Sequence, residues 1–386
     1  MPLCLTFAAP LTTLQRMPVP SDRVNTFQLL APAKINLHLR VGSLSADQFH
    51  PLLTWMCTVA LFDKLTFSYA SNGDLRTENF LADPISSVPI DRLIDLTCTD
   101  PTLPCDESNL ICRCGRVLAL DILSQAQRSI SVPREAESVA GNIALSVGNG
   151  AEKPVEKHRD ESERGRLGLR AVRILLEKKI PTGAGLGGGS SDGATALLGL
   201  NRVWAASPKQ ASEAHHLAKL SSQCGSDLPF FFYGESSICT GRGQYVNPSP
   251  RPKPRWCLLL LPKISMPTPA VYRKFDEMRL GMDRSLTQPP DFIAPDFVSW
   301  SKLPALELLP LLANDLEAPS FAIKPELGQL RMDLEQSIGR IVRMSGSGSS
   351  LFTLFDEQDE CENVATKINS QFNVQAVAVE LAPKNG

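Results

Sequence analysis

The spacing of apolar residues predicts a chain of short strands mixed with helices. Residues 28–41 (QLLAPAKINLHLRV) alternate in part and predict a strand, with Pro32 at an edge or a bulge. Apolar residues at helical spacing between Ser108 and Leu123 predict a helix, and Ser108 or Asn109 is its N-cap. Further strands are expected at residues 61–69, 167–174, 230–233, 237–240, 256–261 and 374–381, a strand or loop at 343–355, and helices at 194–206, 209–223, 269–278, 303–313 and 357–370. The pattern mixes strands with helices and contains no internal repeat.

Changes in composition along the chain predict its domain limits. A length of 386 residues exceeds what one hydrophobic core usually organises, so two lobes are expected. Residues 131–166 are rich in charge and poor in large apolar side chains, which predicts a disordered insertion, with a functional arm as the alternative. Four prolines at 248–254 predict a hinge. We therefore expect domains at 28–247 and 255–386 after a disordered or targeting tail at 1–27.

Overall charge and cysteine spacing argue against several classes of protein. A net charge of −2 provides no general attraction for nucleic acid or an acidic membrane surface. No apolar run reaches the roughly 18 residues of a membrane span. The ten cysteines include no CxxC pair, and adjacent His215 and His216 point to different helix faces. We therefore expect no nucleic-acid or membrane partner, and we assign no metal ligands.

A glycine-rich loop at residues 181–197 (PTGAGLGGGSSDGATAL) is the most informative segment. Five glycines in seven residues allow close approach to a ligand, and the loop runs directly into a helix whose first N–H groups favour an anion. No Lys-Ser or Lys-Thr pair follows, so it is not a Walker A loop. A flexible linker is the alternative. The candidate anion-binding residues are Pro181, Gly183, Ala184, Gly185, Leu186, Gly187, Gly188, Gly189, Ser190 and Ser191.

Three other segments carry candidate functional groups, each with a plainer explanation. Asp227 follows a helix-ending glycine at a loop edge, where it could equally form an Asx-turn. Lys34 is a cation in an otherwise apolar strand and could simply protect a sheet edge. Residues 344–350 (MSGSGSS) offer N–H and hydroxyl groups through Ser345 and Gly346, or form an ordinary hairpin turn.

In this order, the segments APAKINL, PTGAGLGGGSSDGATAL, GSDLPFF and MSGSGS resemble the motif set of the GHMP kinase superfamily. The resemblance covers residues 29 to about 381, apart from 131–166. It implies an α+β, two-lobed GHMP kinase fold, with a ribosomal-protein-S5-like, ATP-binding N-terminal lobe and a ferredoxin-like C-terminal lobe. It also implies ATP as co-substrate with Mg²⁺, and a small-molecule acceptor. Lys34 and Asp227 would be catalytic, Asn109 would lie near adenine, and Ser345 and Gly346 would support the phosphate loop.

Within this superfamily the chain resembles the branch that phosphorylates the 2-hydroxyl of 4-CDP-2-C-methyl-D-erythritol in the non-mevalonate isoprenoid pathway. Asn36 would orient the acceptor. Phe49 would stack on the cytosine and His50 would hydrogen-bond it, while Thr268 and Tyr272 belong to a PTP segment whose aromatic residue would close the other face. Stacking contributes on the order of 1–3 kcal/mol per base. The alternatives are kinases of mevalonate, homoserine or a sugar, and a catalytically silent nucleotide-binding relative, against which Lys34 and Asp227 both argue.

The chain departs from the branch pattern at two positions. Gln48 replaces a glycine, so the turn before Phe49 is expected to differ. Asp192 replaces an asparagine, and we expect it to cap the helix or to reach Mg²⁺ through water. The insertion and the acid-poor N-terminus point to the plastid stroma, with the bacterial cytosol as the alternative. A monomer and a homodimer both remain open.

Overall fold

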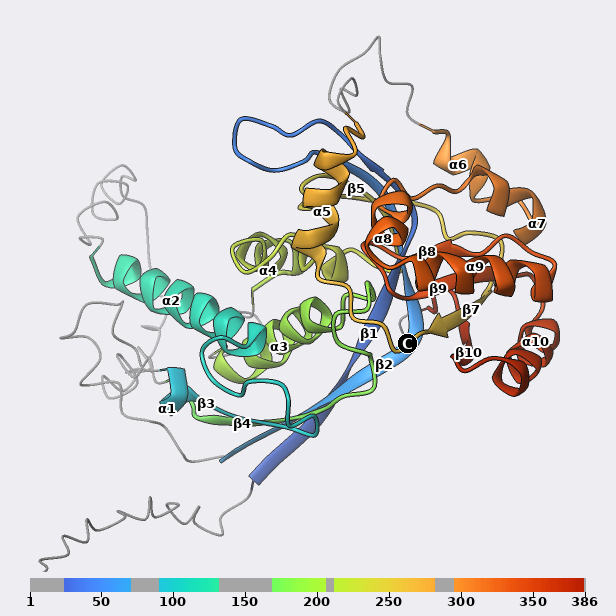
Figure 1. Cartoon of the computed structure of the whole chain (residues 1–386). Helices are drawn as coiled ribbons and strands as arrows, with labels where there is room; N and C mark the ends of the chain where they lie inside the picture. The colour runs from blue at the N-terminus through green and yellow to red at the C-terminus, as the bar shows by residue number, and fades with distance from the viewer. Residues whose placement is uncertain (1–23, 71–89, 132–168, 206–211, 282–294, 385–386) are drawn as a thin grey trace, which may run out of the picture.

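The computed structural model of the chain describes residues 24–70, 90–131, 169–205, 212–281 and 295–384. These residues form two β-sheets with associated helices (Figure 1). The expected tail at 1–27 and insertion at 131–166 lie almost entirely outside the described residues. Among the described residues, none of the helices combines the length and the apolar character needed to cross a bilayer.

The regular elements have the following bounds. The strands are β1 (Val24–Val41), β2 (Leu52–Ala70), β3 (Ile94–Cys98), β4 (Val172–Glu177), β5 (Ser236–Gly241), β6 (Tyr245–Pro248), β7 (Trp256–Leu261), β8 (Arg343–Met344), β9 (Leu351–Phe355) and β10 (Gln375–Glu380). The α-helices are α1 (Ile90–Leu93), α2 (Leu110–Ser131), α3 (Gly188–Trp204), α4 (Ala214–Ser221), α5 (Thr268–Glu277), α6 (Phe297–Trp300), α7 (Ala305–Leu308), α8 (Glu317–Ile323), α9 (Pro325–Ile338) and α10 (Gln358–Gln371). Two 3₁₀ turns are η5 (Pro229–Phe232) and η6 (Leu309–Leu311).

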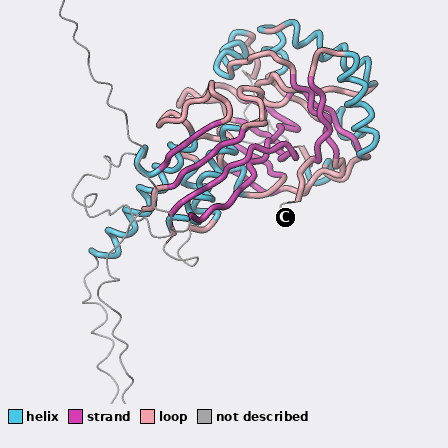
Figure 2. The backbone as a smooth tube through the Cα atoms, turned by 90° about the horizontal axis from the view of Figure 1, so that it is seen from below, coloured by secondary structure: helices cyan, strands magenta, loops and turns pink. Residues whose placement is uncertain are grey.

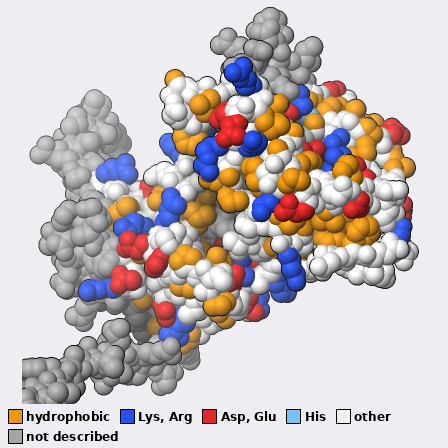
Figure 3. All heavy atoms as spheres, viewed as in Figure 1, with side chains coloured by type: hydrophobic (Ala, Val, Ile, Leu, Met, Phe, Trp, Pro, Cys, Tyr) orange, Lys and Arg blue, Asp and Glu red, His pale blue; other side chains and the backbone are white. Residues whose placement is uncertain are grey.

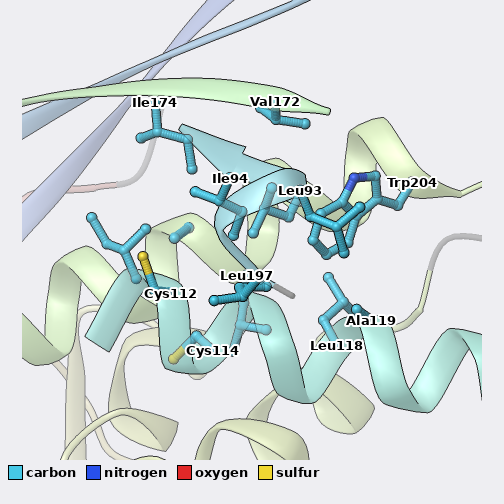
Figure 4. Close-up of a cluster of buried hydrophobic side chains, with 14 of the residues drawn as sticks. Leu93, Ile94, Cys112, Cys114, Leu118, Ala119, Val172, Ile174, Leu197 and Trp204 are labelled. Carbon is cyan, nitrogen blue, oxygen red and sulfur yellow. The ribbon is translucent and has the colours of Figure 1, made fainter. Parts of the chain in front are cut away.

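The N-terminal lobe is a sheet covered by helices. Its strand order is β3-β4-β2-β5-β6, with β1 also paired to β2, and β3 and β4 are its parallel pair. The register of β1 shifts between Pro32 and Ala33, which confirms the predicted bulge. Figure 4 shows Leu118 of α2 and Leu197 of α3 packed with Ile174 of β4 in one apolar cluster. This packing holds α3, and therefore the loop before it, against the sheet.

The C-terminal lobe is a four-stranded sheet of order β10-β7-β9-β8. β10 lies at one edge of this sheet. Figure 2 shows the helices of this lobe on the outer side of its strands. Phe355 of β9 and Ile368 of α10 are buried in the same cluster as Leu39 of β1.

The two lobes are joined through the long β1–β2 ribbon. The Leu39 N–H donates to the Ala313 carbonyl at 2.8 Å, and Val59 bridges to Leu381. A second apolar cluster combines Trp55 of β2 with Phe352 of β9. The ribbon therefore belongs to both cores, and residues on its surface keep a fixed position relative to both lobes.

Most predicted elements are present, and the differences have local causes. Residues 230–233 are not a strand but the 3₁₀ turn η5, because Pro229 fixes φ and has no N–H to give to a sheet. The predicted helix 303–313 is divided into α7 and η6, where Pro310 cannot donate a helical hydrogen bond. The described part of the predicted strand 167–174 is regular only from Val172, and β2 begins nine residues before the predicted strand at 61–69.

Candidate active site

A cavity of about 910 Å³ lies where the glycine loop, the β1–β2 ribbon, the β5–β6 turn and α5 meet. Most of the candidate residues line it. These are Lys34, Asn36, Phe49, His50, Pro181, Gly183, Ala184, Gly185, Gly187, Gly188, Gly189, Ser190, Asp227, Thr268, Tyr272 and Gly346. The structure therefore brings together segments that are more than 300 residues apart in the sequence, such as those of Lys34 and Gly346.

The glycine loop is held in shape by the C-terminal loop. Gly185 has φ 76°, and a Cβ atom there would collide with the Ser345 carbonyl. The Ser345 hydroxyl donates to the Gly185 carbonyl at 2.9 Å, and the Ser350 N–H donates to the Ala184 carbonyl at 3.1 Å. α3 then begins directly after Gly187, which has φ 67°. The free N–H groups of this helix start are therefore placed at the cavity wall.

Lys34 connects this loop to Asp227. Its N–H donates to the Leu186 carbonyl at 2.8 Å, and its aliphatic stem packs so closely on Gly187 that a Cβ there would lie 2.8 Å from Lys34 Cγ. Its Nζ donates to Asn36 Oδ1 at 2.6 Å and lies 3.5 Å from Asp227 Oδ2. The side chain of Lys34 is only 5% exposed, whereas that of Asp227 is 38% exposed. A buried ammonium thus faces a carboxylate that the cavity can reach.

Asn36 is fixed by contacts on both sides. Its Nδ2 donates to the Thr54 hydroxyl at 2.8 Å, and that hydroxyl donates to the His38 carbonyl at 2.8 Å. Its N–H donates to the Ser345 hydroxyl at 3.1 Å. These bonds fix which end of the amide faces Lys34. Thr54 was not among the predicted site residues.

Aromatic groups gather at the other end of the cavity. Tyr272 stacks on His50, with ring centroids 5.5 Å apart and an interplanar angle of 25°. His50 Nδ1 donates to the Gly42 carbonyl at 2.8 Å, and its Nε2 lies 3.3 Å from Asp276 Oδ1. Burial, with a smaller effect from the Asp227 carboxylate, raises the pKa of Tyr272, so its hydroxyl stays protonated. A heterocyclic ring entering here would compete with Asp276 for a hydrogen bond to His50 Nε2.

Phe49 is 49% exposed, and its ring contact is with a residue that the sequence did not single out. The guanidinium carbon of Arg242 lies 3.6 Å from its ring centroid. The preceding Gln48 has φ 64°, a left-handed conformation that glycine adopts without penalty. The turn therefore keeps a conformation suited to glycine despite the different side chain.

A buried charge cluster below the glycine loop was also missed. Lys178 Nζ donates hydrogen bonds to Asp63 and, at 2.8 Å, to Asp192. The exposed fraction of the side chain is 7% for Lys178, 0% for Asp63 and 4% for Asp192. Burial raises the pKa of Asp192 to about 7, although the nearby Lys178 ammonium opposes this. Burial lowers the pKa of Lys178, but Asp192 and Asp63 together raise it above its usual value. The expected capping role of Asp192 is wrong, because α3 has no side-chain cap and Asp192 Oδ2 is turned to Lys178.

Four candidate residues do not line the cavity. Leu186 and Ser191 are buried behind the loop, and Ser345 is buried below it. The Asn109 side chain accepts from the Ile111 N–H at 2.9 Å, as a cap of α2, and donates to the Pro104 carbonyl at 2.7 Å. Its neighbour Leu110 does line the cavity. The predicted N-cap at Asn109 therefore forms, whereas its proposed position near adenine stays a prediction.

Charges around the site are local rather than part of a large field. Figure 3 shows acidic and basic side chains intermixed on the face in view, including a group of both signs over α5. Among the described residues, no cluster of three His, Cys, Asp or Glu side chains could hold a metal ion. Any polyanion would therefore be bound by the loop amides and by individual cations such as Lys34, Lys178 and Arg242.

Comparison with known families agrees with this arrangement. Residues 153–235 match the family described as GHMP kinases N terminal domain, and residues 302–374 match the family described as GHMP kinases C terminal. The first match contains the glycine loop and Asp227, and the second contains the Ser345 loop. The chain thus has the two-lobed α+β GHMP kinase fold.

Individual relatives narrow the family. A 4-diphosphocytidyl-2-C-methyl-D-erythritol kinase of Synechococcus sp. (strain CC9605) is 31% identical over 351 residues, covering 88% of this chain and 91% of the relative. A crystal structure of 4-(cytidine 5'-diphospho)-2C-methyl-D-erythritol kinase superimposes with a TM-score of 0.58 at 28% identity, covering 92% of this chain and 100% of that chain. An L. major mevalonate kinase shares the fold alone, with a TM-score of 0.53 at 10% identity, covering 96% of this chain and 100% of that one. The chain belongs to the 4-diphosphocytidyl-2-C-methyl-D-erythritol kinase family of the GHMP kinases.

Proposed function

We propose that this chain transfers the γ-phosphoryl group of ATP to the 2-hydroxyl of 4-CDP-2-C-methyl-D-erythritol, a step of the non-mevalonate isoprenoid pathway. The observation that carries the proposal is the position of Lys34, which packs on Gly187 of the phosphate loop and whose Nζ lies 3.5 Å from Asp227 Oδ2. Family membership supports ATP as the donor. The activity in the relatives' names supports the acceptor.

On the donor side, the glycine loop would bind the β- and γ-phosphates. Positive φ at Gly183, Gly185 and Gly187 turns successive amides of the loop, and the start of α3 adds N–H groups with the positive end of the helix dipole. Ser190 lines the same cavity. Such a cradle binds the phosphates without any lysine in the loop itself.

On the acceptor side, Asp227 would orient the hydroxyl and take its proton as the oxygen attacks the γ-phosphorus. The bond from that phosphorus to the β-γ bridging oxygen breaks, and ADP leaves. Lys34 would hold Asp227 and stabilise charge on the phosphoryl group in transit. Asn36 fixes the Lys34 ammonium through its 2.6 Å hydrogen bond and so sets its direction. Each residue then acts in positioning or in charge stabilisation, which is most of what this reaction requires.

At the far end, Phe49 and Tyr272 would form the sides of a pocket for the cytosine ring, with His50 and Thr268 beside it. Thr268 is held by its hydroxyl contact with Ser347 at 2.8 Å. The half-exposed ring of Phe49 and the more deeply buried ring of Tyr272 suit a stacked base. Acceptors such as mevalonate and homoserine carry no ring to fill this region, which favours the cytidylyl substrate.

Mg²⁺ would arrive with ATP, held mainly by the phosphate oxygens. At the start of α3, Ser191 Oγ and Asp192 Oδ1 are buried oxygens with no hydrogen-bond partner within the described residues. Hard oxygen donors of this kind fit the ion, either directly or through water. The bound ion would supply charge neutralisation between the β- and γ-phosphates.

The decisive test is coupled measurement of ADP release by the purified chain with four acceptors. We expect turnover with 4-CDP-2-C-methyl-D-erythritol and none above background with mevalonate, homoserine or galactose. Turnover with only one of the other three acceptors would mean that the chain phosphorylates that compound instead. ATP binding without turnover of any acceptor would support a silent relative.

We also propose that the chain acts in the plastid stroma, with the bacterial cytosol as the alternative, as a monomer or homodimer acting on a small molecule without nucleic acid or membrane. The acid-poor N-terminal sequence supports the plastid assignment. Residues 1–27 fused to a fluorescent protein should direct it to plastids, and a diffuse cytosolic signal would favour the alternative.

A further inference from the structure

Arg242 occupies a position between the two ends of the cavity, and the reaction proposed above gives it no role. It lies in the turn between β5 and β6 and lines the cavity. Its guanidinium rests on the Phe49 ring at 3.6 Å, at the aromatic end. The next residue, Gly243, lies at the other end, where a Cβ atom would be 3.4 Å from Asp227 Oδ1. One turn of the chain thus spans from the aromatic pocket to the Lys34–Asp227 pair.

The turn is held in a defined shape. The Arg242 N–H donates to Gln244 Oε1 at 2.6 Å, and the Gly243 N–H donates to the Thr240 carbonyl at 3.1 Å. Gly243 has φ 111°, a conformation that glycine adopts readily and other residues rarely do. The backbone position of Arg242 is therefore fixed while its side chain, 40% exposed, can adjust.

The guanidinium has a replaceable partner. Arg242 Nη2 lies 2.5 Å from Asp47 Oδ2, and the Asp47 side chain is 52% exposed. Through this hydrogen bond Arg242 lowers the pKa of Asp47, so the carboxylate is ionised at neutral pH. An exposed ion pair of this kind is readily exchanged for a better anion. A guanidinium can also remain stacked on an aromatic face while its in-plane N–H groups bind phosphate.

We propose that Arg242 binds the diphosphate of the cytidylyl substrate and thereby selects a nucleoside diphosphate conjugate over an uncharged nucleoside. The inference rests on the proposed function, in which the base lies at Phe49 and the reacting hydroxyl at Asp227. A diphosphate links those two parts of the substrate and must cross the space beside residue 242. Asp47 holds the guanidinium over Phe49 in the free chain and yields it to the diphosphate.

Other cations near this path are less suited. Lys34 is already engaged by Asn36 and Asp227, and Lys178 is enclosed by two carboxylates under the glycine loop. Arg273 also lines the cavity, from α5, and is the alternative cation for this role among the described residues.

The test compares binding of CDP and cytidine to the full chain by titration calorimetry. We expect wild type to bind CDP more tightly than cytidine, and Arg242→Gln to reduce that ratio about tenfold or more, since a charged hydrogen-bond pair is lost. Cytidine affinity should change much less. Arg242→Lys should retain part of the ratio, because it keeps the charge and loses the fork. Arg202→Gln is the matched control, since Arg202 also lies over a phenylalanine ring, 4.7 Å from the Phe27 centroid.

The possible outcomes separate this inference from the reaction itself. The inference would be overturned if the ratio of the affinities for CDP and cytidine were unchanged in Arg242→Gln, or if that ratio fell only in Arg273→Gln. The proposed function would still stand if the chain turned over the cytidylyl substrate. If Arg242→Gln weakened the binding of CDP and of cytidine equally, Arg242 would only support the Phe49 ring. That result would also overturn the inference. A wild-type chain that binds neither ligand would remove both proposals.

Discussion

Replacing Asp192 by asparagine should remove a pH-dependent loss of stability. Asp192 and Asp63 share the single ammonium of Lys178 in a buried site, so one negative charge is in excess. Burial raises the folded pKa of Asp192 from its ordinary 3.8 to about 7. At about 1.4 kcal/mol per pH unit, this difference corresponds to a loss of about 4 kcal/mol by the time the carboxyl is fully ionised. The opposing effect of the charged Lys178 is already part of this pKa.

The sign follows from which state holds the proton. Between about pH 4 and 7 the unfolded chain has lost the Asp192 proton while the folded chain keeps it, so this group stabilises the fold at low pH and ceases to do so as pH rises through 7. Asparagine does not titrate and can still accept a hydrogen bond from Lys178. The free energy of unfolding of Asp192→Asn should therefore improve relative to wild type by about 1–3 kcal/mol between pH 5 and pH 8.

Urea unfolding of both proteins at pH 5, 6, 7 and 8 measures this change, since most other titrating groups cancel in the difference. Asp296→Asn provides the control. Hydrogen bonds from Ser299 lower the pKa of Asp296, so its effect should be constant over this pH range. A pH-independent difference for Asp192→Asn, or one that favours aspartate as pH rises, would refute the assignment of the excess charge to Asp192.

Three further predictions concern the cavity walls. Phe49→Ala should raise KM for the cytidylyl substrate about tenfold, through loss of stacking, with little change in KM for ATP. Steady-state kinetics with each substrate varied in turn measures both constants, and a rise in KM for ATP alone would contradict the prediction. Gly185→Ala should destabilise the chain by about 2 kcal/mol or more and abolish tight ATP binding, because of its positive φ and the collision with the C-terminal loop. Gly189→Ala should be tolerated, because a Cβ atom at residue 189 would lie 3.7 Å from its nearest neighbour, Leu110 Cδ1. Equal losses of thermal stability in Gly185→Ala and Gly189→Ala would contradict this prediction. Asn314→Ala should lower stability by about 2–3 kcal/mol, because its amide donates to two buried carbonyls of the C-terminal loop at 2.8 and 2.7 Å; a change below 0.5 kcal/mol, roughly that of a neutral surface substitution, would exclude that role.

The fold and much of the cavity wall could be predicted because they depend on local chemistry. Glycines at 183, 185 and 187 are needed for positive φ whatever surrounds them, and the helix that follows is encoded in its own apolar spacing. The order of four motifs then placed Lys34 and Asp227 in one family pattern, and the structure brings their side chains to 3.5 Å.

The groups that sequence reasoning missed depend on contacts between distant segments. Lys178 meets Asp63 across a separation of 115 residues, and Arg242 meets Asp47 across 195. Neither cation belongs to a glycine-rich or alternating pattern, so each reads locally as a solvated charge. The wrong strand prediction at 230–233 had a different origin. The apolar run there has the length of a strand, but Pro229 precedes it and favours a 3₁₀ turn.

The central claim is that Asp227 acts on the acceptor hydroxyl while the glycine loop holds ATP, and Asp227→Asn tests it most directly. This side chain is 38% exposed, so the substitution should leave the fold intact. Turnover of 4-CDP-2-C-methyl-D-erythritol should fall about 10²- to 10⁴-fold while the Kd for ATP stays within a factor of about two. Undiminished turnover would contradict the account, and so would a loss of turnover explained wholly by weaker ATP binding.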